Sequence, residues 1–386
     1  MKQRTFKLKE FAQDISVAVK DAQLSPLKRF VGLEHYDSNE PVITRFTDTS
    51  LLSSSVKEFS ENDILIARRN VYLRRAGIVF FSGLTSGDSI VLRIYNDCED
   101  RTGIPKDDAI RIIPFILNSN DFWAYANKHA DGMNSKRISK DMLYDYEFSL
   151  PPIEEQRILA DKLWAAYRLK ESYKKLLTAT QEMVKSQFIE MFGNQNTNDK
   201  QWTESLVKDE FKLSMGKTPA RSNPECWENG THRWISISDM ATYTRYTCDT
   251  SEYITDYAIT DSGIKVVPKG TIIMSFKLSI GRTAITSEDI YTNEAIMAFA
   301  DFDEKKFNID FLHFLIANKN WLLGAKQAVK GQTLNKESFG NAKISIPPIE
   351  MQEEFASIYN QADKSEFELR KSIEAIDQAI KSLINN

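Results

Sequence analysis

The chain has 386 residues, with 50 Lys and Arg against 54 Asp and Glu, so its formal net charge is −4. This length predicts two or three domains, and a composition of 42% hydrophobic and 27% charged residues is typical of a globular protein. A slightly acidic average argues against nucleic acid as a partner, because proteins that bind it usually present a basic surface.

Several other classes of protein are disfavoured. No apolar run approaches the roughly 20 residues of a membrane span, and the N-terminus is too polar for a signal peptide. We therefore expect no membrane association. The three cysteines and four histidines are scattered without the paired spacing of a zinc site or a disulfide framework. We expect no bound metal and a reducing cytoplasm.

In chain order, the first 152 residues predict a domain that mixes strands and helices. β-Branched and aromatic residues favour strands at 63–67, 77–81 and 88–94, and an amphipathic pattern favours a helix at 107–130. Between Ile64 and Gly87 no acidic residue occurs, although four arginines do.

A Pro-Pro pair marks the end of this domain. Proline keeps the preceding residue extended, and a second proline is well tolerated near a helix start. Glu154 and Glu155 follow in the first turn, where the helix dipole favours carboxylates. No further Pro or Gly occurs before Gly193. The sequence therefore predicts one helix over 153–193, with apolar residues at threes and fours as in a coiled coil.

The second half of the chain repeats the first. Leu150-Pro151-Pro152-Ile153-Glu154-Glu155-Gln156 recurs 196 residues later as Ile346-Pro347-Pro348-Ile349-Glu350-Met351-Gln352. Residues 194–347 predict a second domain, with strands at 234–238 and 270–276 and a helix at 308–329. Residues 348–386 predict a second long helix. We align Arg68-Arg69-Asn70 with Ser275-Phe276-Lys277, and Ser86-Gly87-Asp88 with Thr292-Asn293-Glu294.

The two long helices are predicted to pair with each other. They would be about 60 Å and 54 Å long at 1.5 Å per residue, whereas a domain of this size spans about 30 Å. The alternative is that each helix docks only on its own domain. The fold class is therefore α+β, with two pseudo-symmetric domains and two antiparallel helices in a coiled coil.

The charge is unevenly distributed along this repeat. The last helix holds 4 basic and 8 acidic residues, so it accounts for the whole net charge. Acid-free basic runs occur at 64–87 and 262–287, which are corresponding positions of the repeat, and again at 311–336. Such local positive potential suits a phosphate backbone, although a solvated strand face would look similar.

No catalytic motif assembles. Gly216-Lys217-Thr218 lacks the earlier glycine of a phosphate-binding loop, since position 211 is Phe211. The Ser-hydrolase elbow, the zinc-protease helix and the dinucleotide fingerprint are absent from the sequence. A nuclease would need only scattered carboxylates and a lysine, but no cluster of them indicates one.

The chain resembles the specificity subunits of type I restriction-modification systems. The resemblance rests on FSLPPIEEQ at 148–156 and ISIPPIEMQ at 344–352, with support from WISISDM at 234–240, PKGTIIMSFKLSIGRTAI at 268–285, YTNEAIMAF at 291–299 and KGQTLNKESF at 330–339. It covers essentially the whole chain, and its strength lies in the order and spacing of the motifs. The first domain matches the family more loosely than the second.

The resemblance implies two target recognition domains, each reading half of a bipartite DNA site, and two helices that set the gap between the halves. It implies double-stranded DNA, two modification (methyltransferase) subunits and a restriction (translocase) subunit as partners. This chain would bind no cofactor; S-adenosylmethionine, ATP and Mg would belong to the partners. Two alternatives stay open: the recognition part of a single-chain restriction enzyme, and a coiled-coil scaffold that binds only protein.

Candidate residues follow from side-chain type, because Arg and Lys contact phosphate or guanine whereas Asn and Gln read adenine. The DNA-binding candidates are Arg68, Arg69, Asn70, Arg74, Arg75, Asn134, Lys136, Arg137, Lys217, Thr218, Lys277, Arg282, Lys330, Gln332 and Asn335. The partner-binding candidates on the helices are Leu159, Leu163, Tyr173, Leu177, Phe355, Ile358, Leu369, Ile373 and Ile376.

Overall fold

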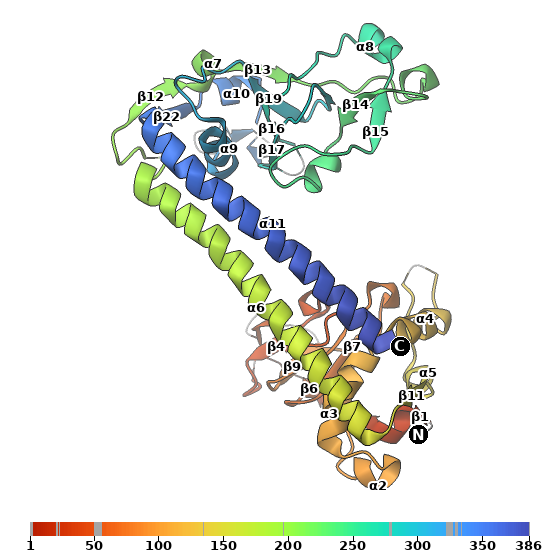
Figure 1. Ribbon diagram of the computed structural model, residues 1–386. Helices are drawn as coiled ribbons and strands as arrows, with labels where there is room; N and C mark the ends of the chain where they lie inside the picture. The colour runs from red at the N-terminus through yellow and green to blue at the C-terminus, as the bar shows by residue number, and fades with distance from the viewer. Residues whose placement is uncertain are drawn as a thin grey trace. The chain divides into compact units, whose positions relative to one another are not determined.

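The chain forms two compact units in a computed structural model (Figure 1). The first unit comprises residues 1–175 and 370–386, and the second comprises residues 176–369. The structure describes residues 3–20, 22, 24–49, 56–133, 135–195, 197–277, 280–321, 327–328, 331–332 and 334–385. Each unit mixes helices and strands, which confirms the α+β class. No helix in these ranges is long and apolar enough to cross a bilayer.

The first unit is built on two sheets and a two-stranded ribbon. The main sheet is antiparallel, with the order β2 (Ala12–Asp14), β10 (Ser89–Ile94), β7 (Ile64–Ala67) and β8 (Ala76–Ile78). The second sheet has the order β3 (Ala18–Val19), β6 (Val56–Phe59), β9 (Gly83–Ser86), β4 (Arg29–Val31) and β5 (Thr47–Asp48), and the ribbon pairs β1 (Arg4–Lys7) with β11 (Glu147–Leu150). Its short helices are α1 (Leu8–Phe11), α2 (Cys98–Thr102), α3 (Lys106–Ile116), α4 (Asn120–Lys128) and α5 (Lys140–Tyr144), with 3₁₀ turns η1 (Leu33–His35) and η3 (Val71–Leu73).

The central strand β7 is buried on both faces, which explains its continuous apolar run. Ile64 and Ile66 pack in a core with the helices, whereas Leu65 and Ala67 pack against the second sheet. Alternate side chains of a strand point to opposite faces, so one four-residue strand contributes to two cores.

The second unit repeats this plan. Its main sheet has the order β13 (Lys212–Met215), β19 (Ile296–Ala300), β16 (Ile272–Ser275) and β17 (Thr283–Ile285), and its second sheet β15 (Glu252–Ile254), β14 (His232–Ile235) and β18 (Tyr291–Thr292). The remaining pairs are β12 (Thr203–Leu206) with β22 (Lys343–Ile346), and β20 (Gln327–Ala328) with β21 (Gly331–Gln332). Its helices are α7 (Val207–Glu210), α8 (Asp256–Ser262), α9 (Ile309–Asn318) and α10 (Lys336–Gly340), with 3₁₀ turns η4 (Pro224–Cys226) and η5 (Asp239–Ala241).

Strand pairing fixes which residues of the two units correspond. Ile66 pairs with Ala76 and Ile90, and Met274 pairs with Thr283 and Met297. The register therefore matches Arg69 with Lys277 and Arg75 with Arg282. Our sequence alignment of Asn70 with Lys277, and of Asp88 with Glu294, is wrong by one residue. The first domain carries one extra residue in this turn, and no strand pairing constrains an alignment made on the sequence alone.

The two long helices occur where the sequence predicts them, as α6 (Ile153–Phe192) and α11 (Ile349–Asn385). The glutamine of each repeat motif is buried and fastens the preceding turn: Gln156 Nε2 donates to the Pro151 carbonyl at 2.7 Å, and Gln352 Nε2 to the Pro347 carbonyl at 2.8 Å. The motif is thus a structural joint at which each domain passes into its helix.

In each unit, parts of α6 and α11 pack together. In the second unit, Gln181 donates to Glu366 at 2.9 Å, and the rings of Phe192 and Phe355 lie 5.7 Å apart. Between these two contacts the residue number rises along α6 and falls along α11, so the two helices are antiparallel. In the first unit, Lys170 pairs with Asp377 at 2.5 Å. The predicted antiparallel pairing is confirmed.

Other boundaries differ from the prediction. The helix expected at 107–130 is two helices, because the Ser119 hydroxyl caps α4 by accepting a hydrogen bond from the Phe122 amide. The helix expected at 308–329 ends at Asn318, where Lys319 turns extended with ψ of 137°. The strands expected at 77–81 and 234–238 lie one to three residues earlier, at β8 and β14.

Candidate nucleic-acid interface

A tight turn between β7 and β8 carries most of the arginines of the first unit. Asn70 and Arg74 have φ of 55° and 51°, in the left-handed region that only Gly enters easily. They flank the 3₁₀ turn η3 on both sides. Two non-glycine residues in this conformation hold the chain in a sharp turn that gathers Arg68, Arg69, Arg74 and Arg75.

A second segment joins this turn from far along the sequence. The Asn70 amide donates to the Lys136 carbonyl at 2.7 Å, and the Ile138 amide donates to the Arg68 carbonyl at 3.0 Å. Arg69 and Arg137 form an antiparallel bridge. Two basic groups about 65 residues apart in sequence therefore meet in one place. We call this the first basic surface: Arg68, Arg69, Arg74, Arg75, Lys136 and Arg137.

Three arginines of the first basic surface, Arg69, Arg75 and Arg137, are held by neighbouring groups. Asp88 lies between Arg69 and Arg137, at 3.8 Å and 3.5 Å. Arg75 donates to the carbonyls of Leu33 and Arg69, at 2.9 Å and 3.0 Å, and burial lowers the pKa of its guanidinium. These bonds orient the arginine side chains before any ligand arrives.

A half-buried lysine lies near the first basic surface. The Lys57 ammonium donates to the Ser89 carbonyl at 2.8 Å. Burial is the main cause that lowers the pKa of Lys57; the charges of Asp14 and Asp88 oppose it, while those of Lys140 and Arg68 add to it. Lys57 therefore shares its surroundings with both acidic and basic neighbours, Arg68 among them.

The second unit has the corresponding turn between β16 and β17. The Ser275 amide donates to the Arg282 carbonyl at 2.9 Å, as the Ala67 amide does to the Arg75 carbonyl at 2.9 Å. Lys277 is exposed beside the Phe276 ring, 5.5 Å from its centre. The exposed Arg282 guanidinium forms no hydrogen bond or ion pair with the residues described by the structure. We call Lys277 and Arg282 the second basic surface.

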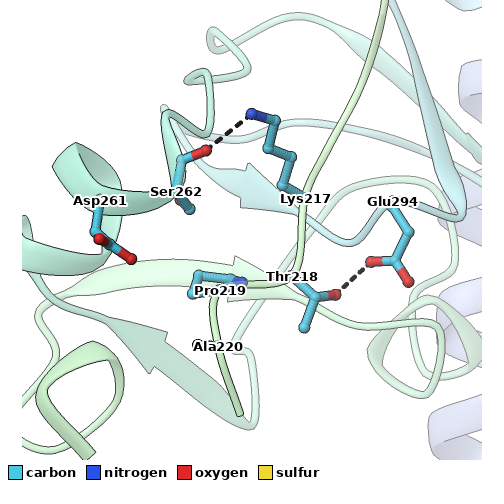
Figure 2. Close-up of a pocket in the computed structure, with 7 residues that line it drawn as sticks. All are labelled: Lys217, Thr218, Pro219, Ala220, Asp261, Ser262 and Glu294. Atoms are coloured by element: carbon cyan, nitrogen blue, oxygen red, sulfur yellow. Dashed lines mark hydrogen bonds between the residues drawn. The ribbon is translucent and has the colours of Figure 1, made fainter. Parts of the chain in front are cut away.

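A hollow of about 570 Å³ lies on the same unit and contains the other two candidates (Figure 2). Lys217 Nζ donates to the Ser262 carbonyl at 2.8 Å, and the Thr218 hydroxyl donates to the Glu294 carboxylate. The complete lining is Lys217, Thr218, Pro219, Ala220, Asp261, Ser262 and Glu294. The geometry differs from a phosphate-binding loop, because Lys217 is occupied by a carbonyl.

Glu294 connects the hollow to the second basic surface. Burial alone would raise the pKa of Glu294, but the Thr218 hydrogen bond and the charges of Lys277 and Arg221 together lower it. Lys277 is therefore near enough to Glu294 to influence its charge. Arg221 stacks on Trp227 and Trp234, with its guanidinium carbon 4.0 Å and 4.8 Å from the ring centres.

The remaining candidates fall in three groups. Asn335 caps helix α10, since its side chain accepts a hydrogen bond from the Ser338 amide at 2.8 Å. Gln332 lies in β21, and its side chain is outside the description. Asn134 and Lys330 lie outside the described residues.

The apolar helix residues that we expected to bind partner subunits are largely used inside the units. Leu163 and Phe355 are 1% and 0% exposed, and Leu159 and Ile376 pack against the first core. Leu163 and Phe355 are therefore covered by the chain itself, and for these two residues the prediction is wrong. Leu159 and Ile376 are half-buried, and their role in partner binding stays a prediction. Tyr173, Leu177, Ile358, Leu369 and Ile373 are half-buried. The exposed apolar side chains of the helices are Ile158, Leu169, Leu176, Met183, Ile189 and Phe367.

Sequence reasoning missed the acidic members of both surfaces. The candidates were chosen as cations and amides, which leaves out Asp88 and Glu294. Asp88 directly follows the acid-free run 64–87 and directly precedes the buried strand β10, and that placement was a usable signal. Glu294 lies beyond Glu288 and Asp289, so no such signal marked it. In the described part of the chain, no three His, Cys, Asp or Glu residues could hold a metal ion.

The comparisons with known proteins agree with this architecture. Residues 199–378 match the family described as type I restriction modification DNA specificity domain. The MjaIX specificity subunit of Methanocaldococcus jannaschii is 25% identical over 191 residues, which is 48% of this chain and 44% of that protein. The EcoBI specificity subunit of Escherichia coli is 23% identical over 302 residues, covering 67% of this chain and 61% of that protein. The chain thus spans about half the length of the curated relatives it matches.

Solved structures show the same fold over the full length. The specificity subunit of a type I system from M. genitalium superposes with a TM-score of 0.54 at 12% identity, covering 100% of this chain and 95% of that one. A chain from a study of type I complex assembly and conformational transition gives a TM-score of 0.57 at 15% identity, covering 99% and 96%. The resemblance found in the sequence is confirmed for residues 199–378, which match the type I restriction modification DNA specificity domain, and the rest of the chain is similar in fold to specificity subunits of such systems.

Proposed function

We propose that this chain is the DNA-recognition subunit of a type I restriction-modification complex. The observation that carries the proposal is the duplicated turn: Arg69 with Arg75, and Lys277 with Arg282, occupy the same register in two sheets of identical order. A bipartite site needs two readers built alike but with different side chains. Residues 1–152 and 194–347 would be those two target recognition domains.

Electrostatics supports a nucleic-acid ligand. The two domains are close to neutral overall, and the excess acid lies in the last helix. Basic residues gathered in a turn raise the local positive potential, which attracts phosphates and gives binding that weakens with salt. Arginines positioned by Asp88 and by carbonyls can donate bidentately to guanine.

The helices 153–193 and 348–386 would set the gap between the half-sites and dock the partners. Each unit leaves apolar side chains of α6 exposed: Ile158 and Leu169 in the first, Leu176 and Met183 in the second. Leu176 and Met183 are seven residues apart, the spacing of a seam for another helix. Exposed apolar side chains of α6 on each unit are consistent with one docking surface for each of two modification subunits.

Catalysis would belong to those partners. In this proposal the modification subunits bind S-adenosylmethionine, and the restriction subunit uses ATP and Mg, while this chain supplies recognition only. A complex acting on chromosomal DNA would work in the cytoplasm of a bacterial or archaeal cell.

Methylation mapping tests the proposal. Genomes of cells with and without this chain, both expressing the modification subunits, would be sequenced for modified bases. A bipartite motif should be methylated only in the presence of the chain. An unchanged methylation pattern would refute the recognition role.

The spacer role can be tested separately. Four residues inserted beside Thr178 in α6, with four beside Leu369 in α11, add about one turn, or 5.4 Å, to each helix. At about 3.4 Å per base pair, the gap should lengthen by about one or two base pairs while both half-sites stay the same. A motif with altered bases and an unchanged gap would contradict the role of the helices as a spacer.

Salt dependence separates the two alternative functions. For the assembled complex, the logarithm of the binding constant should fall linearly with the logarithm of salt concentration if phosphates are contacted. A flat response would favour a scaffold that binds only protein. Methylation or cleavage by the purified chain alone would favour a single-chain enzyme.

A further inference from the structure

Glu294 stands out on the proposed DNA-binding face because it is an exposed carboxylate next to cations. It lines the hollow, across from Asp261 (Figure 2). Lys277 is near enough to affect its charge. A carboxylate repels phosphate, so its presence on such a face calls for a different contact. The inference below rests on the function proposed above and assigns this residue a part in it.

The carboxylate of Glu294 is held in place by a chain of hydrogen bonds. Asn293 Nδ2 donates to the Thr218 hydroxyl at 3.0 Å, so the single Thr218 proton is directed to Oε2 of Glu294. Asn293 is itself fixed, because its Oδ1 accepts from the Ala295 amide at 2.7 Å and its amide donates to the Ile235 carbonyl at 3.0 Å. The relay therefore starts from the backbone of the sheet and orients one side chain.

The other oxygen of this carboxylate remains available. Oε1 of Glu294 accepts no hydrogen bond from another residue in the described part of the chain, and the residue is exposed. Partial desolvation would raise the pKa of Glu294, but the Thr218 hydroxyl, the residue's own backbone amide and the charges of Lys277 and Arg221 together lower it, so the group stays ionised at neutral pH. Oε1 is therefore an acceptor on an oriented carboxylate to which no other described residue donates.

DNA offers few donors that such an acceptor can use. In the major groove they are the amino groups at N4 of cytosine and N6 of adenine, and Glu or Asp typically accepts from cytosine N4. We propose that Glu294 is a base-reading residue of the second domain, with Oε1 accepting a hydrogen bond from the exocyclic amino group of cytosine or adenine in the major groove. Neighbouring Lys277 would contact the phosphate backbone.

Two other carboxylates show why the inference falls on Glu294. Asp88, one position away from it in the repeat, is engaged through both oxygens by Arg69 and Arg137. Asp261 lines the same hollow, but no hydrogen bond from another described residue orients it. Among these three, only Glu294 is both oriented by a neighbouring side chain and left with an oxygen to which no other described residue donates.

The experiment compares Glu294→Gln with Asp261→Asn in cells that carry the complete modification complex. Each variant removes one negative charge from the same hollow, so a general electrostatic effect should be equal in both. Methylation mapping of each strain gives the motif and its stringency. Glu294→Gln should relax or change one base pair of one half-site, with preference at that position falling about tenfold or more, because the amide can no longer accept as an anion. Asp261→Asn should leave the motif unchanged.

A second variant tests the anchoring relay. Thr218→Val keeps the carboxylate but removes the hydroxyl that orients it. It should relax the same base position by a smaller factor than Glu294→Gln.

Four results would overturn the inference. These are an unchanged motif with Glu294→Gln, an equal change with Asp261→Asn, a change at a different position with Thr218→Val, and loss of the entire motif with Glu294→Gln, which would mark a structural role. In each case a wild-type strain that still methylates a bipartite motif leaves the proposed function intact. Absence of any chain-dependent motif in the wild type would refute that function instead.

Discussion

The two units share the same backbone hydrogen bonds but differ in electrostatics. The difference is clearest in the loop whose backbone bonds to β8 in the first unit and to β17 in the second. In the first unit an acid of this loop, Glu40, binds Lys170 and Lys174 of α6 at 2.6 Å and 2.9 Å. In the second unit a base of the same loop, Arg245, pairs with Asp310 and with Asp363 of α11. The backbone bonds to Ile78 and Ile285 are equivalent, while the sign of the charge is reversed.

The basic surfaces differ in a second way. Arg75 is tied to two carbonyls, whereas Arg282, in the same register, is exposed and without such bonds to described residues. Strand pairing therefore holds the scaffold constant while the side chains projecting from it vary. In the proposed function, two readers of different DNA sequence would require this arrangement.

The largest effect on stability is expected at the ion pair between Arg245 and Asp310. Arg245 is 2% exposed, donates to Asn360 at 2.9 Å and lies 4.2 Å from the centre of the Tyr359 ring. Arg245→Leu should destabilise the second unit by about 2–4 kcal/mol, because the largely buried Asp310 loses its cationic partner and keeps only the hydrogen bond from Asn360. Hydrogen exchange measured by mass spectrometry should localise the loss to residues 176–369. Equal loss of protection in the first unit would contradict the division into two units.

The next largest effect is expected in the pH dependence of stability, which should differ between the two units. Burial is the main cause that lowers the pKa of His313 to about 4, and Arg245 adds to it. The unfolded chain binds the proton near 6.5, so the second unit should lose stability as pH falls from about 6.5 to 4, by up to roughly 3 kcal/mol. Asn118 in the first unit and Asn318 in the second each donate to the carbonyl four residues earlier, which aligns His313 with the fully buried Ile113. The first unit should therefore show no such loss from this position.

The control is His313→Ile, which copies the residue of the first unit. Hydrogen exchange of the two units at pH 7 and pH 5 would be compared. The variant should remove most of the acid sensitivity of the second unit. An unchanged pH dependence would place its origin in another group.

The sequence predicts the parts of this fold that depend on periodicity. The repeat, both long helices and their antiparallel pairing follow from apolar spacing and the Pro-Pro motif. Breaks within helices do not follow from spacing, because the Ser119 cap and the extended turn at Lys319 depend on single hydrogen bonds. The strand register shows that Lys277 corresponds to Arg69 and not to Asn70. This register depends on contacts between residues distant in sequence.

The candidate site is predictable to a similar extent. Acid-free runs located the turns that carry Arg69 and Lys277. That Arg137 would join Arg69 could not be read from the sequence, because the bridge closes over a separation of 68 residues. The same limit applies to the helix stripes: periodicity identifies an apolar face, but only packing decides that Leu163 and Phe355 are covered by the chain itself.

A smaller difference in stability is expected between variants of Arg75, which bonds to two carbonyls, and Arg282, which forms no such bonds to described residues. Arg75→Ala should destabilise the first unit by about 1–3 kcal/mol, since the carbonyls of Leu33 and Arg69 lose their donors. Arg282→Ala should change stability by less than about 0.5 kcal/mol, as at most exposed sites. If Arg282 contacts phosphate, its removal should reduce the slope of log binding constant against log salt by about 1, equally for all sequences.

Both variants should be examined by urea unfolding and by salt titration of DNA binding in the assembled complex. A motif altered at one base pair by Arg282→Ala would instead place this side chain at a base edge. Equal destabilisation by the two variants would show that Arg282 is held as firmly as Arg75.

The smallest effect is expected at Asn335, where two roles compete. Its side chain accepts from the Ser338 amide and caps α10, as Ser139 caps α5 in the first unit by accepting from the Met142 amide at 3.2 Å. Asn335→Ala should cost about 1 kcal/mol, within the usual range for a lost cap. Asn335→Asp preserves the cap but removes the amide donor needed to read adenine. Methylation mapping of this variant should therefore show an unchanged motif if Asn335 acts only as a cap. A change at a single adenine would show that the amide also reads DNA, and the second unit would then differ from the first in using a helix cap for recognition.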